Sequence, residues 1–250
     1  LFENKSDAFS TTHDDISLKT KVEDTIDSRL RSLSLEKKVI GFYLSGHPIK
    51  EYQDEISSMS IKSIASYFDK LYSTDIDDEF SEHGTVSGVI TSVRSQRMGK
   101  DRFINILTVD DSTRRLEIIL FSDVYEKYRN LIKENEILFF SGVIAMDDYN
   151  GDLSMKATKV IDMDSARQQY SKEIEIFILP EHINDNILAR IVHLLEPHKN
   201  GKCPLTIKCL SNQHIVPLEL DNEWLINPSS TLINGLSDLL GKENIIVKYE

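Results

Sequence analysis

TVSGVITSV at residues 85–93 opens the stretch of sequence that decides the fold. It is rich in β-branched residues, and a polar loop separates it from a second run of this kind, RFINILTV, at residues 102–109. A third run, LEIILF at residues 116–121, follows the turn sequence DDST at residues 110–113. The three runs predict consecutive strands with tight connections.

A short helix interrupts the predicted strands. Ser122 or Asp123 can cap a helix that runs through Ile132, because its apolar residues recur at helical spacing. Two further strands then meet across Asn150-Gly151, a dipeptide typical of β-hairpin turns. Three strands, a helix and two strands form the element order of the five-stranded OB-fold barrel, which binds oligomers. We predict an OB-fold domain at residues 84–165 that binds single-stranded nucleic acid.

The charge balance weighs against indiscriminate binding of nucleic acid. The 250 residues include 29 Lys and Arg against 41 Asp and Glu, so the net charge is −12. Residues 84–165 are the least acidic part, with 11 basic and 13 acidic side chains, whereas residues 1–83 carry 10 and 17. Basic residues gather on the first hairpin of the barrel, where the local field decides what docks. They are Arg94, Arg97, Lys100, Arg102, Arg114 and Arg115.

These basic residues, together with Lys156, are candidates for phosphate contacts. Phe103 and Tyr149 are candidate platforms on which bases stack, while a core position is the alternative for Phe103. A solvated basic face without a ligand is the alternative for the whole set. Nothing resembles a base-reading helix, so we expect no sequence-specific readout.

The sequence contains no recognisable catalytic motif. Neither a Gly-x-Ser-x-Gly elbow nor a Gly-rich phosphate loop followed by Lys-Ser/Thr is present. The doublets at residues 110–111 and 147–148 lie at strand ends, where Asp commonly starts a turn. Four possible zinc ligands lack the close pair that pins a zinc-binding turn; they are His198, Cys203, Cys209 and His214. We expect no metal, no cofactor and two reduced structural thiols in one strand.

The length of the chain allows two or three domains. Residues 1–34 are predicted to be a polar arm or linker, and residues 35–83 a helical segment with an acidic connector at 73–83. No run reaches the apolar length of a membrane helix, and no signal segment is recognised at the start. The composition therefore favours a cytoplasmic protein without membrane contact.

Two helices are expected in the helical segment. Residues 35–44 form the first, with an apolar face at Leu35, Val39, Phe42 and Tyr43. Gly46 is expected to end this helix. Pro48 is well placed to begin the second, which runs to Ile56, because the first turn of a helix needs no amide there.

Residues 172–250 predict a small α/β sandwich of βαββαβ order, compatible with a split βαβ fold. Strands are expected at 173–179, 203–210, 215–226 and 244–249, and helices at 184–195 and 229–240. Residues 167–172 are the expected linker to the barrel. Trp224 is a candidate anchor for a partner, although a strand aromatic is more often a core residue. The chain as a whole is thus predicted to be an α+β multidomain protein.

GFYLSGHPI at residues 41–49, followed by LTVDD at 107–111 and LEIILF at 116–121, resembles the C-terminal region of the bacterial DNA polymerase III alpha subunit family. Further agreement in order and spacing comes from SGV at 141–143, DDY at 147–149, MKA at 155–157 and DMDSAR at 162–167. The resemblance implies a non-catalytic segment of a DNA-directed DNA polymerase whose catalytic aspartates lie upstream. The missing initial Met is what such a fragment would show.

The resemblance also implies partners. In this family the terminal domain binds the tau subunit of the clamp loader, and a sliding-clamp motif ending in Leu-Phe or Met-Phe lies just before the region resembled here. Leu1 and Phe2 are candidates for the truncated end of that motif, with weak clamp binding, and ordinary residues at an arbitrary chain end are the alternative. The rest of the polymerase chain is the remaining implied partner.

Two other functions are compatible with a barrel. A protein-interaction scaffold of the replisome needs no DNA binding, because a barrel binds protein as readily as DNA. A tRNA-binding module of a synthetase shares the barrel but accounts for neither the GHP motif at residues 46–48 nor the βαββαβ tail. Salt separates the first two possibilities, since DNA binding weakens steeply as salt rises.

Overall fold

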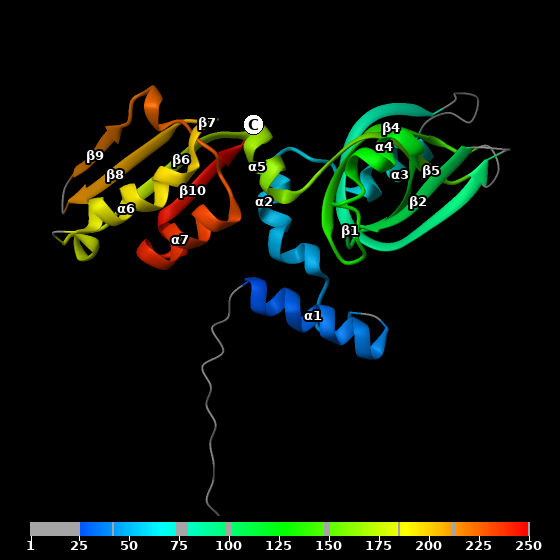
Figure 1. The fold of residues 1–250 in the computed structure, drawn as a ribbon, viewed down its shortest axis with the longest axis horizontal. Helices are drawn as coiled ribbons and strands as arrows, with labels where there is room; N and C mark the ends of the chain where they lie inside the picture. The colour runs from blue at the N-terminus through cyan, green and yellow to red at the C-terminus, as the bar shows by residue number, and fades with distance from the viewer. Residues whose placement is uncertain are drawn as a thin grey trace, which may run out of the picture.

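The computed structural model describes residues 26–41, 43–73, 80–98, 102–147, 151–184, 186–211 and 214–249. A helical segment is followed by a closed barrel and then by an α/β domain with a four-stranded sheet. Figure 1 shows the barrel and the α/β domain beside each other, with helix α5 between them and helix α1 projecting from the body. No helix within these ranges is long and apolar enough to cross a membrane.

The helical segment differs from its prediction. Helix α1 (Ile26–Ile40) begins inside the predicted arm and ends at Ile40, before Gly41 and not at Gly46 as expected; the φ of +93° at Gly41 suits a glycine. Leu35 and Val39, predicted to share a buried apolar face, are exposed, whereas Leu33 is buried. The 3-10 helix η1 (Pro48–Tyr52) and helix α2 (Gln53–Ser58) follow. Phe42, the third member of the predicted face, lies outside the described residues.

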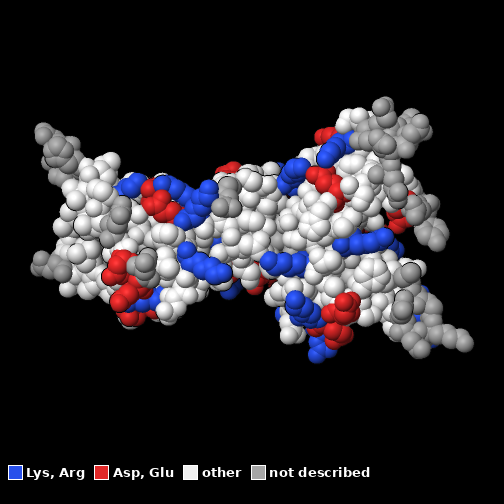
Figure 2. All heavy atoms as spheres, turned by 90° about the horizontal axis from the view of Figure 1, so that it is seen from above, with Lys and Arg blue, Asp and Glu red and all other residues white. Residues whose placement is uncertain are grey.

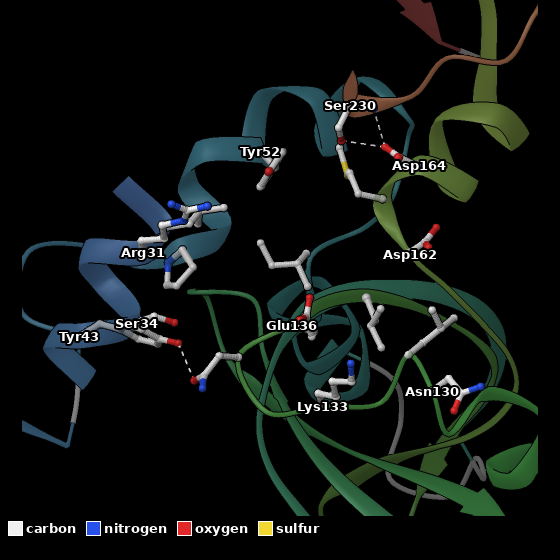
Figure 3. A pocket seen from close by; sticks show the side chains of 17 residues that line it. Arg31, Ser34, Tyr43, Tyr52, Asn130, Lys133, Glu136, Asp162, Asp164 and Ser230 are labelled. Carbon is white, nitrogen blue, oxygen red and sulfur yellow. Dashed lines mark hydrogen bonds between the residues drawn. The ribbon is translucent and has the colours of Figure 1, made fainter. Parts of the chain in front are cut away.

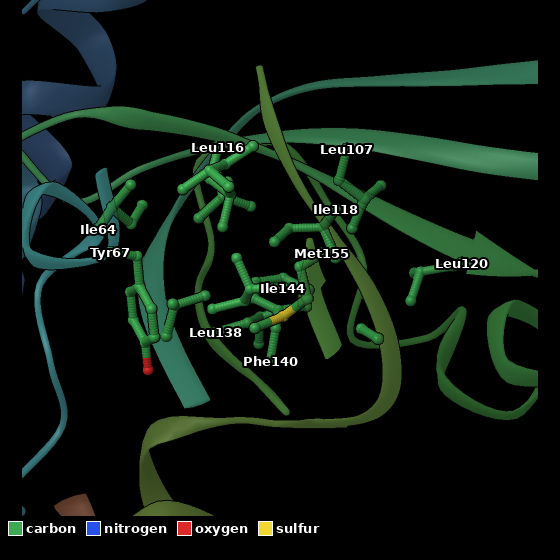
Figure 4. Close-up of a cluster of buried hydrophobic side chains, with 14 of the residues drawn as sticks. Ile64, Tyr67, Leu107, Leu116, Ile118, Leu120, Leu138, Phe140, Ile144 and Met155 are labelled. Carbon is green, nitrogen blue, oxygen red and sulfur yellow. The ribbon is translucent and has the colours of Figure 1, made fainter. Parts of the chain in front are cut away.

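Helix α3 (Ile64–Ser73) lies within the predicted helical segment, but no individual helix was expected at its position. Ile64, Tyr67 and Phe68 of this helix are buried in the core of the barrel. Figure 4 shows Ile64 and Tyr67 beside the side chains that the strands contribute. The predicted acidic connector at 73–83 is shorter than expected, because Glu82 lies in a strand and forms ion pairs with lysines at 62 and 70. Residues 74–79 lie outside the described residues.

The barrel closes in the strand order β1-β2-β3-β5-β4. Its strands are β1 (Ser81–Met98), β2 (Arg102–Asp110), β3 (Arg115–Phe121), β4 (Ile137–Met146) and β5 (Leu153–Ile161). Strand β1 is long enough to pair with β4 along its first half and with β2 along its second half. Helix α4 (Ser122–Tyr128) lies between β3 and β4 and ends before the predicted Ile132. Between β4 and β5, residues 148–150 lie outside the described residues.

Alternating side chains from the strands fill the barrel. Leu107, Ile118, Phe140, Ile144 and Met155 are fully buried and converge in Figure 4. Because successive side chains on a strand point to opposite faces, the residues between these positions face outward. The outward set therefore holds the candidate binding residues.

The α/β domain contains a sheet with the order β10-β6-β8-β9, one face of which packs against helices α6 and α7. Its elements are β6 (Ser171–Ile178), α6 (Ile187–Leu195), β7 (Lys199–Cys203), β8 (Leu205–Ser211), β9 (His214–Glu219), α7 (Ser230–Leu240) and β10 (Ile245–Tyr249). Strands β6 and β8 are adjacent and parallel, so the βαβ unit is not split by a strand between them. The antiparallel strand β9 lies at the outer edge instead.

Two predicted strands of this domain are interrupted. The strand expected at 203–210 divides at Pro204, which has no amide hydrogen to donate to a ladder, into β7 and β8. The strand expected at 215–226 ends at Glu219, and Trp224 lies in the 3-10 turn η4 (Asn222–Trp224). The Asp221 side chain stabilises this turn by accepting a hydrogen bond from the amide of Glu223 at 3.1 Å.

The expected linker at residues 167–172 is instead ordered structure. Helix α5 (Met163–Tyr170) leads directly into β6, and the side chain of Arg167 is buried. Its Nε and Nη2 donate to the two carboxylate oxygens of Glu55 at 2.7 and 2.9 Å. Its Nη1 donates to Asp164 at 3.0 Å and to Ser230 at 2.6 Å, and the hydroxyl of Tyr249 also contacts Glu55. This joint connects α2, α5 and the last domain.

A cavity of about 610 Å³ lies where the three parts meet. Figure 3 shows its lining from α1, from the segment before β4, from α5 and from the start of α7. Tyr43 donates a hydrogen bond to Asn135 at 3.0 Å, and Ser230 donates to Asp164. None of the predicted site residues within the described ranges lines this cavity.

Candidate nucleic-acid interface

One row of paired residues crosses four strands of the barrel. Arg94 on β1 lies opposite Ile106 on β2, and Ile106 lies opposite Ile119 on β3. Ile119 is in turn aligned with Lys156 on β5. Residues opposite each other in a ladder lie on the same side of a sheet, so Arg94 and Lys156 both point outward from the closed barrel, whereas Ile106 between them is buried. We call this surface the outer face.

Two further rows belong to the outer face. On one side Thr108, Glu117 and Ser154 are aligned, and on the other side Ile104 is aligned with Phe121. Phe121 is 45% exposed and is a potential stacking platform that the sequence analysis missed. The alternation in LEIILF was the signal, because residues 117, 119 and 121 must face away from the buried positions 116, 118 and 120.

Carboxylates neutralise two of the predicted arginines on this surface. Arg94 donates to Glu117 at 2.6 Å, and the Nε of Arg115 donates to Asp110 at 2.9 Å. Burial raises the pKa of Asp110, but the neighbouring His47, Arg115 and the amide of Ser112 outweigh burial and hold this pKa well below its usual value. Asp110 is therefore a fixed negative charge next to Arg115.

A groove of about 510 Å³ opens at one end of the outer face. Arg114 and Arg115 line it together with Phe68, Thr108, Leu116, Glu117, Asp152, Leu153 and Ser154. The guanidinium of Arg114 lies over the ring of Phe68, with 4.5 Å between its central carbon and the ring centroid. The groove thus combines aromatic, cationic and hydroxyl groups, together with two carboxylates.

Two of the remaining predicted residues of the barrel, Arg97 and Phe103, do not join this surface. Arg97 and Phe103 are aligned with each other on the opposite face of the β1–β2 hairpin, and Phe103 is 50% exposed rather than part of the core. Lys100 and Tyr149 lie outside the described residues, as does the side chain of Arg102.

Asp111 and the two cysteines were considered for metal or thiol chemistry, but their contacts indicate structural roles. Asp111 is buried and accepts hydrogen bonds from the amides of Thr113, Arg114 and Ile64 at 2.8, 3.0 and 2.7 Å. It thereby holds the β2–β3 turn and the start of α3. Cys203 and Cys209 are free thiols on different strands, and burial raises the pKa of Cys203. The described ranges contain no cluster of three metal-ligating side chains.

Trp224 packs half-buried against the core of the last domain. The Nζ of Lys199 lies 3.5 Å from the centroid of its ring, which covers part of the indole. Both observations favour a packing role for this side chain.

On the face drawn in Figure 2, positive charge is not concentrated in a single large patch. Figure 2 shows basic side chains interspersed with acidic ones over the barrel and the last domain on the face in view. The charged side chains of the outer face therefore decide what binds there more than the electrostatic field of the whole molecule does.

Comparisons with known proteins agree with this architecture. A family model described as an OB-fold nucleic acid binding domain matches residues 85–163, and the model of the C-terminal domain of DNA polymerase III subunit alpha matches residues 190–241. The DNA polymerase III subunit alpha of Vibrio cholerae serotype O1 is 31% identical over 214 residues, which cover 86% of this chain. The resemblance is confirmed. The chain belongs to the DNA polymerase III alpha subunit family.

The polymerase subunit of Escherichia coli strain K12 is similar to the same extent, at 32% identity over 218 residues and 86% of this chain. The chain spans 18% of the length of either relative. Among solved structures, the second single-stranded DNA binding protein (SSBb) of Mycobacterium smegmatis is 18% identical, with a TM-score of 0.30 over 34% of this chain and 92% of that one. A likeness of this size carries no argument about function.

Proposed function

We propose that this chain is the C-terminal part of a cytoplasmic DNA polymerase III alpha subunit and that its barrel binds single-stranded DNA on the outer face. The observation that carries the proposal is the alignment of Arg94 and Lys156 across β1, β2, β3 and β5, next to a groove lined by Arg114 and Arg115. The strand-2 and strand-3 face is also where OB-folds bind oligonucleotides.

Binding follows from the kinds of side chain present. Arg94, Arg115 and Lys156 pair with phosphates and release their counterions, while the ring of Phe121 accepts a stacked base. Stacking and phosphate pairing are indifferent to sequence, so the barrel binds any unpaired template strand. The affinity is low, because Glu117 and Asp110 already engage two of the arginines.

The polymerase reaction belongs to the proposed whole protein. We assign no catalytic residue to this chain, and nucleotide transfer takes place at aspartates in the preceding part of the polypeptide. The role of the barrel is to hold the single-stranded template close to that site.

The last domain provides the proposed tether to the tau subunit of the clamp loader. Apolar side chains exposed around α6 and β9 support a protein partner there; they are Ile183, Leu188, Val192, Val216 and Leu218. Trp224 is a weaker candidate anchor than these residues, because it packs against the domain core. Clamp binding through Leu1 and Phe2 remains a prediction, since both lie outside the described residues.

A scaffold that holds replisome proteins together without binding DNA is the second candidate. The net charge of −12 and the ion pairs of Arg94 and Arg115 favour it. The two functions differ in what they require of the outer face, because a scaffold needs no free positive charge there.

Fluorescence anisotropy of a labelled oligothymidine, titrated with this chain at several salt concentrations, tests the proposal. Binding should weaken as salt rises, and an Arg94→Glu/Lys156→Glu variant should bind at least tenfold more weakly. Arg129→Glu, at an exposed arginine beside α4, is the matched control and should change binding little. Undetectable binding at low salt, or equal binding by both variants, contradicts the proposal and favours the scaffold.

A further inference from the structure

The helical segment contributes an aromatic side chain to the end of the groove. Tyr72 on α3 is 68% exposed, and the guanidinium carbon of Arg114 lies 5.8 Å from the centroid of its ring. The same guanidinium lies 4.5 Å from the ring of Phe68, one helical turn earlier. Arg114 therefore lies over two rings of α3, of which one is buried and the other faces solvent.

Stacking leaves the hydrogen-bond donors of Arg114 available. Among the described residues no carboxylate forms an ion pair with Arg114, in contrast to Arg94 and Arg115. A guanidinium stacked on a ring keeps its in-plane N–H groups free and presents a flat cationic surface. Nucleobases stack on such planes and on aromatic rings.

Arg115 is held at the same end of the groove with part of its guanidinium free. Asp110 engages its Nε, while the side chain as a whole is 71% exposed. The Oδ1 of Asp110 accepts a hydrogen bond from the amide of Ser112 at 2.9 Å, and the Nε2 of His47 lies 3.4 Å from the same oxygen. The terminal nitrogens of Arg115 can therefore bind an anion without releasing Asp110.

We propose that Tyr72, Arg114 and Arg115 form a nucleotide subsite, in which a base stacks on Tyr72 and Arg114 and the adjoining phosphate binds Arg115. The subsite rests on the proposed function and extends the DNA path from the barrel strands onto α3. Glu117 and Asp152 also line the groove, so stacking rather than net charge supplies most of the binding there.

Two sets of variants test the subsite in the full chain, with a labelled oligothymidine as the probe. Tyr72→Ala and Arg114→Ala should each weaken binding by about 5- to 150-fold, the range expected for the loss of one stacked base. Tyr72→Phe keeps the ring and should bind like the unaltered chain. The double variant should lose less than the product of the single losses, because both residues contact one base.

A folding defect is separated from a binding defect by the thermal midpoint. Tyr72 is exposed, so Tyr72→Ala should leave this midpoint nearly unchanged. In addition, photocrosslinking of the unaltered chain to an oligonucleotide that contains 5-iodouracil should label the peptide carrying Tyr72, whether or not any variant folds.

The possible outcomes separate the subsite from the proposed function. Normal binding by Tyr72→Ala and Arg114→Ala, with weak binding by Arg94→Glu/Lys156→Glu, overturns the subsite and leaves the outer face as the DNA site. Crosslinks confined to peptides outside α3 and the β2–β3 turn overturn it as well. Absence of binding by the unaltered chain overturns both.

Discussion

At the scale of single residues, Glu117 controls how much positive charge the outer face presents. Its carboxylate lies 2.6 Å from Arg94 and in the row next to Lys156. Both members of the Arg94 pair are partly solvent-exposed, so the pair contributes little to folding. The ion pair has a larger effect on the binding of an anionic ligand, because it neutralises the charge of Arg94.

Replacing Glu117 by Gln should strengthen binding of single-stranded DNA by about two- to fivefold at low salt, because it removes a negative charge and frees Arg94. Anisotropy titrations measure the change, which should shrink as salt rises. Glu126→Gln, which disrupts the exposed pair with Arg129, is the control. Equal or weaker binding by Glu117→Gln would show that phosphates do not approach this row.

A second prediction at this scale concerns Asp110 and how the stability of the fold depends on pH. Its pKa is below the value of about 3.9 expected in an unfolded chain, so its bonds stabilise the fold above that pH and this stability is lost as pH falls further. Asp110→Asn should cost about 1–3 kcal/mol at pH 6. The cost should stay constant down to about pH 5 and shrink below about pH 4.

Urea unfolding at a series of pH values measures this difference. Asp69→Asn, at an exposed position on α3, is the control. A cost that did not change between pH 6 and pH 3 would show that ionisation of Asp110 is not what stabilises the turn.

At the scale of elements, the strands and helices that could be predicted were those expected from the spacing of apolar residues in the sequence. Alternating β-branched runs and the Gly at residue 151 of the predicted hairpin placed β2, β3, β4 and β5 close to their observed positions. Helix α3 was missed although the sequence carries its signals. Ser63 caps it by accepting a hydrogen bond from the amide of Ser66 at 3.3 Å, and Ile64, Tyr67, Phe68 and Leu71 recur at helical spacing.

The candidate site shows the same limit. Composition located the basic hairpin, but strand register divides it, so that Arg94 and Arg97 lie on opposite faces. Arg115 comes onto the face of Arg94 through the pairing of the consecutive strands β2 and β3, whereas Lys156 does so through the pairing of β3 with the sequence-distant β5. Phe121 lies close to Arg114 and Arg115 in the sequence and could have been found from the alternation of residues 116–121, whereas Tyr72 lies far from the basic cluster.

A further prediction concerns Gly142, where β4 and β5 approach each other closely. A Cβ at this position would lie 2.2 Å from the carbonyl oxygen of Lys156 and 2.7 Å from the Cα of Ala157, and backbone atoms cannot move aside. Gly142→Ala should therefore cost about 2–3 kcal/mol in the free energy of unfolding. Ser81→Ala, at the exposed start of β1, should stay within about 0.5 kcal/mol in the same urea titrations. A similarly small cost for Gly142→Ala would contradict this close approach.

At the scale of the whole molecule, the joint at Arg167 fixes the last domain against the helical segment. The buried guanidinium contacts Glu55 with two nitrogens, and Asp164 and Ser230 with the third. A partner tethered to the last domain would consequently be held at a defined position relative to the barrel.

Arg167→Ala should cost about 3–5 kcal/mol, because it leaves partly buried carboxylates without their cation. It should also loosen the last domain, so the radius of gyration measured by small-angle X-ray scattering should increase. Arg129→Ala is the control at an exposed ion pair. An unchanged scattering curve together with unchanged stability would show that other contacts hold the domains together.

The central claim is that single-stranded DNA lies on the outer face of the barrel. Amide chemical shifts of the isotope-labelled chain, followed by NMR during titration with an oligothymidine, test it most directly. The account predicts that shifts concentrate on β2, β3 and β5, around Thr108, Glu117, Ile119 and Lys156. Shifts confined to α6 and β9, or no shifts at low salt, would contradict it.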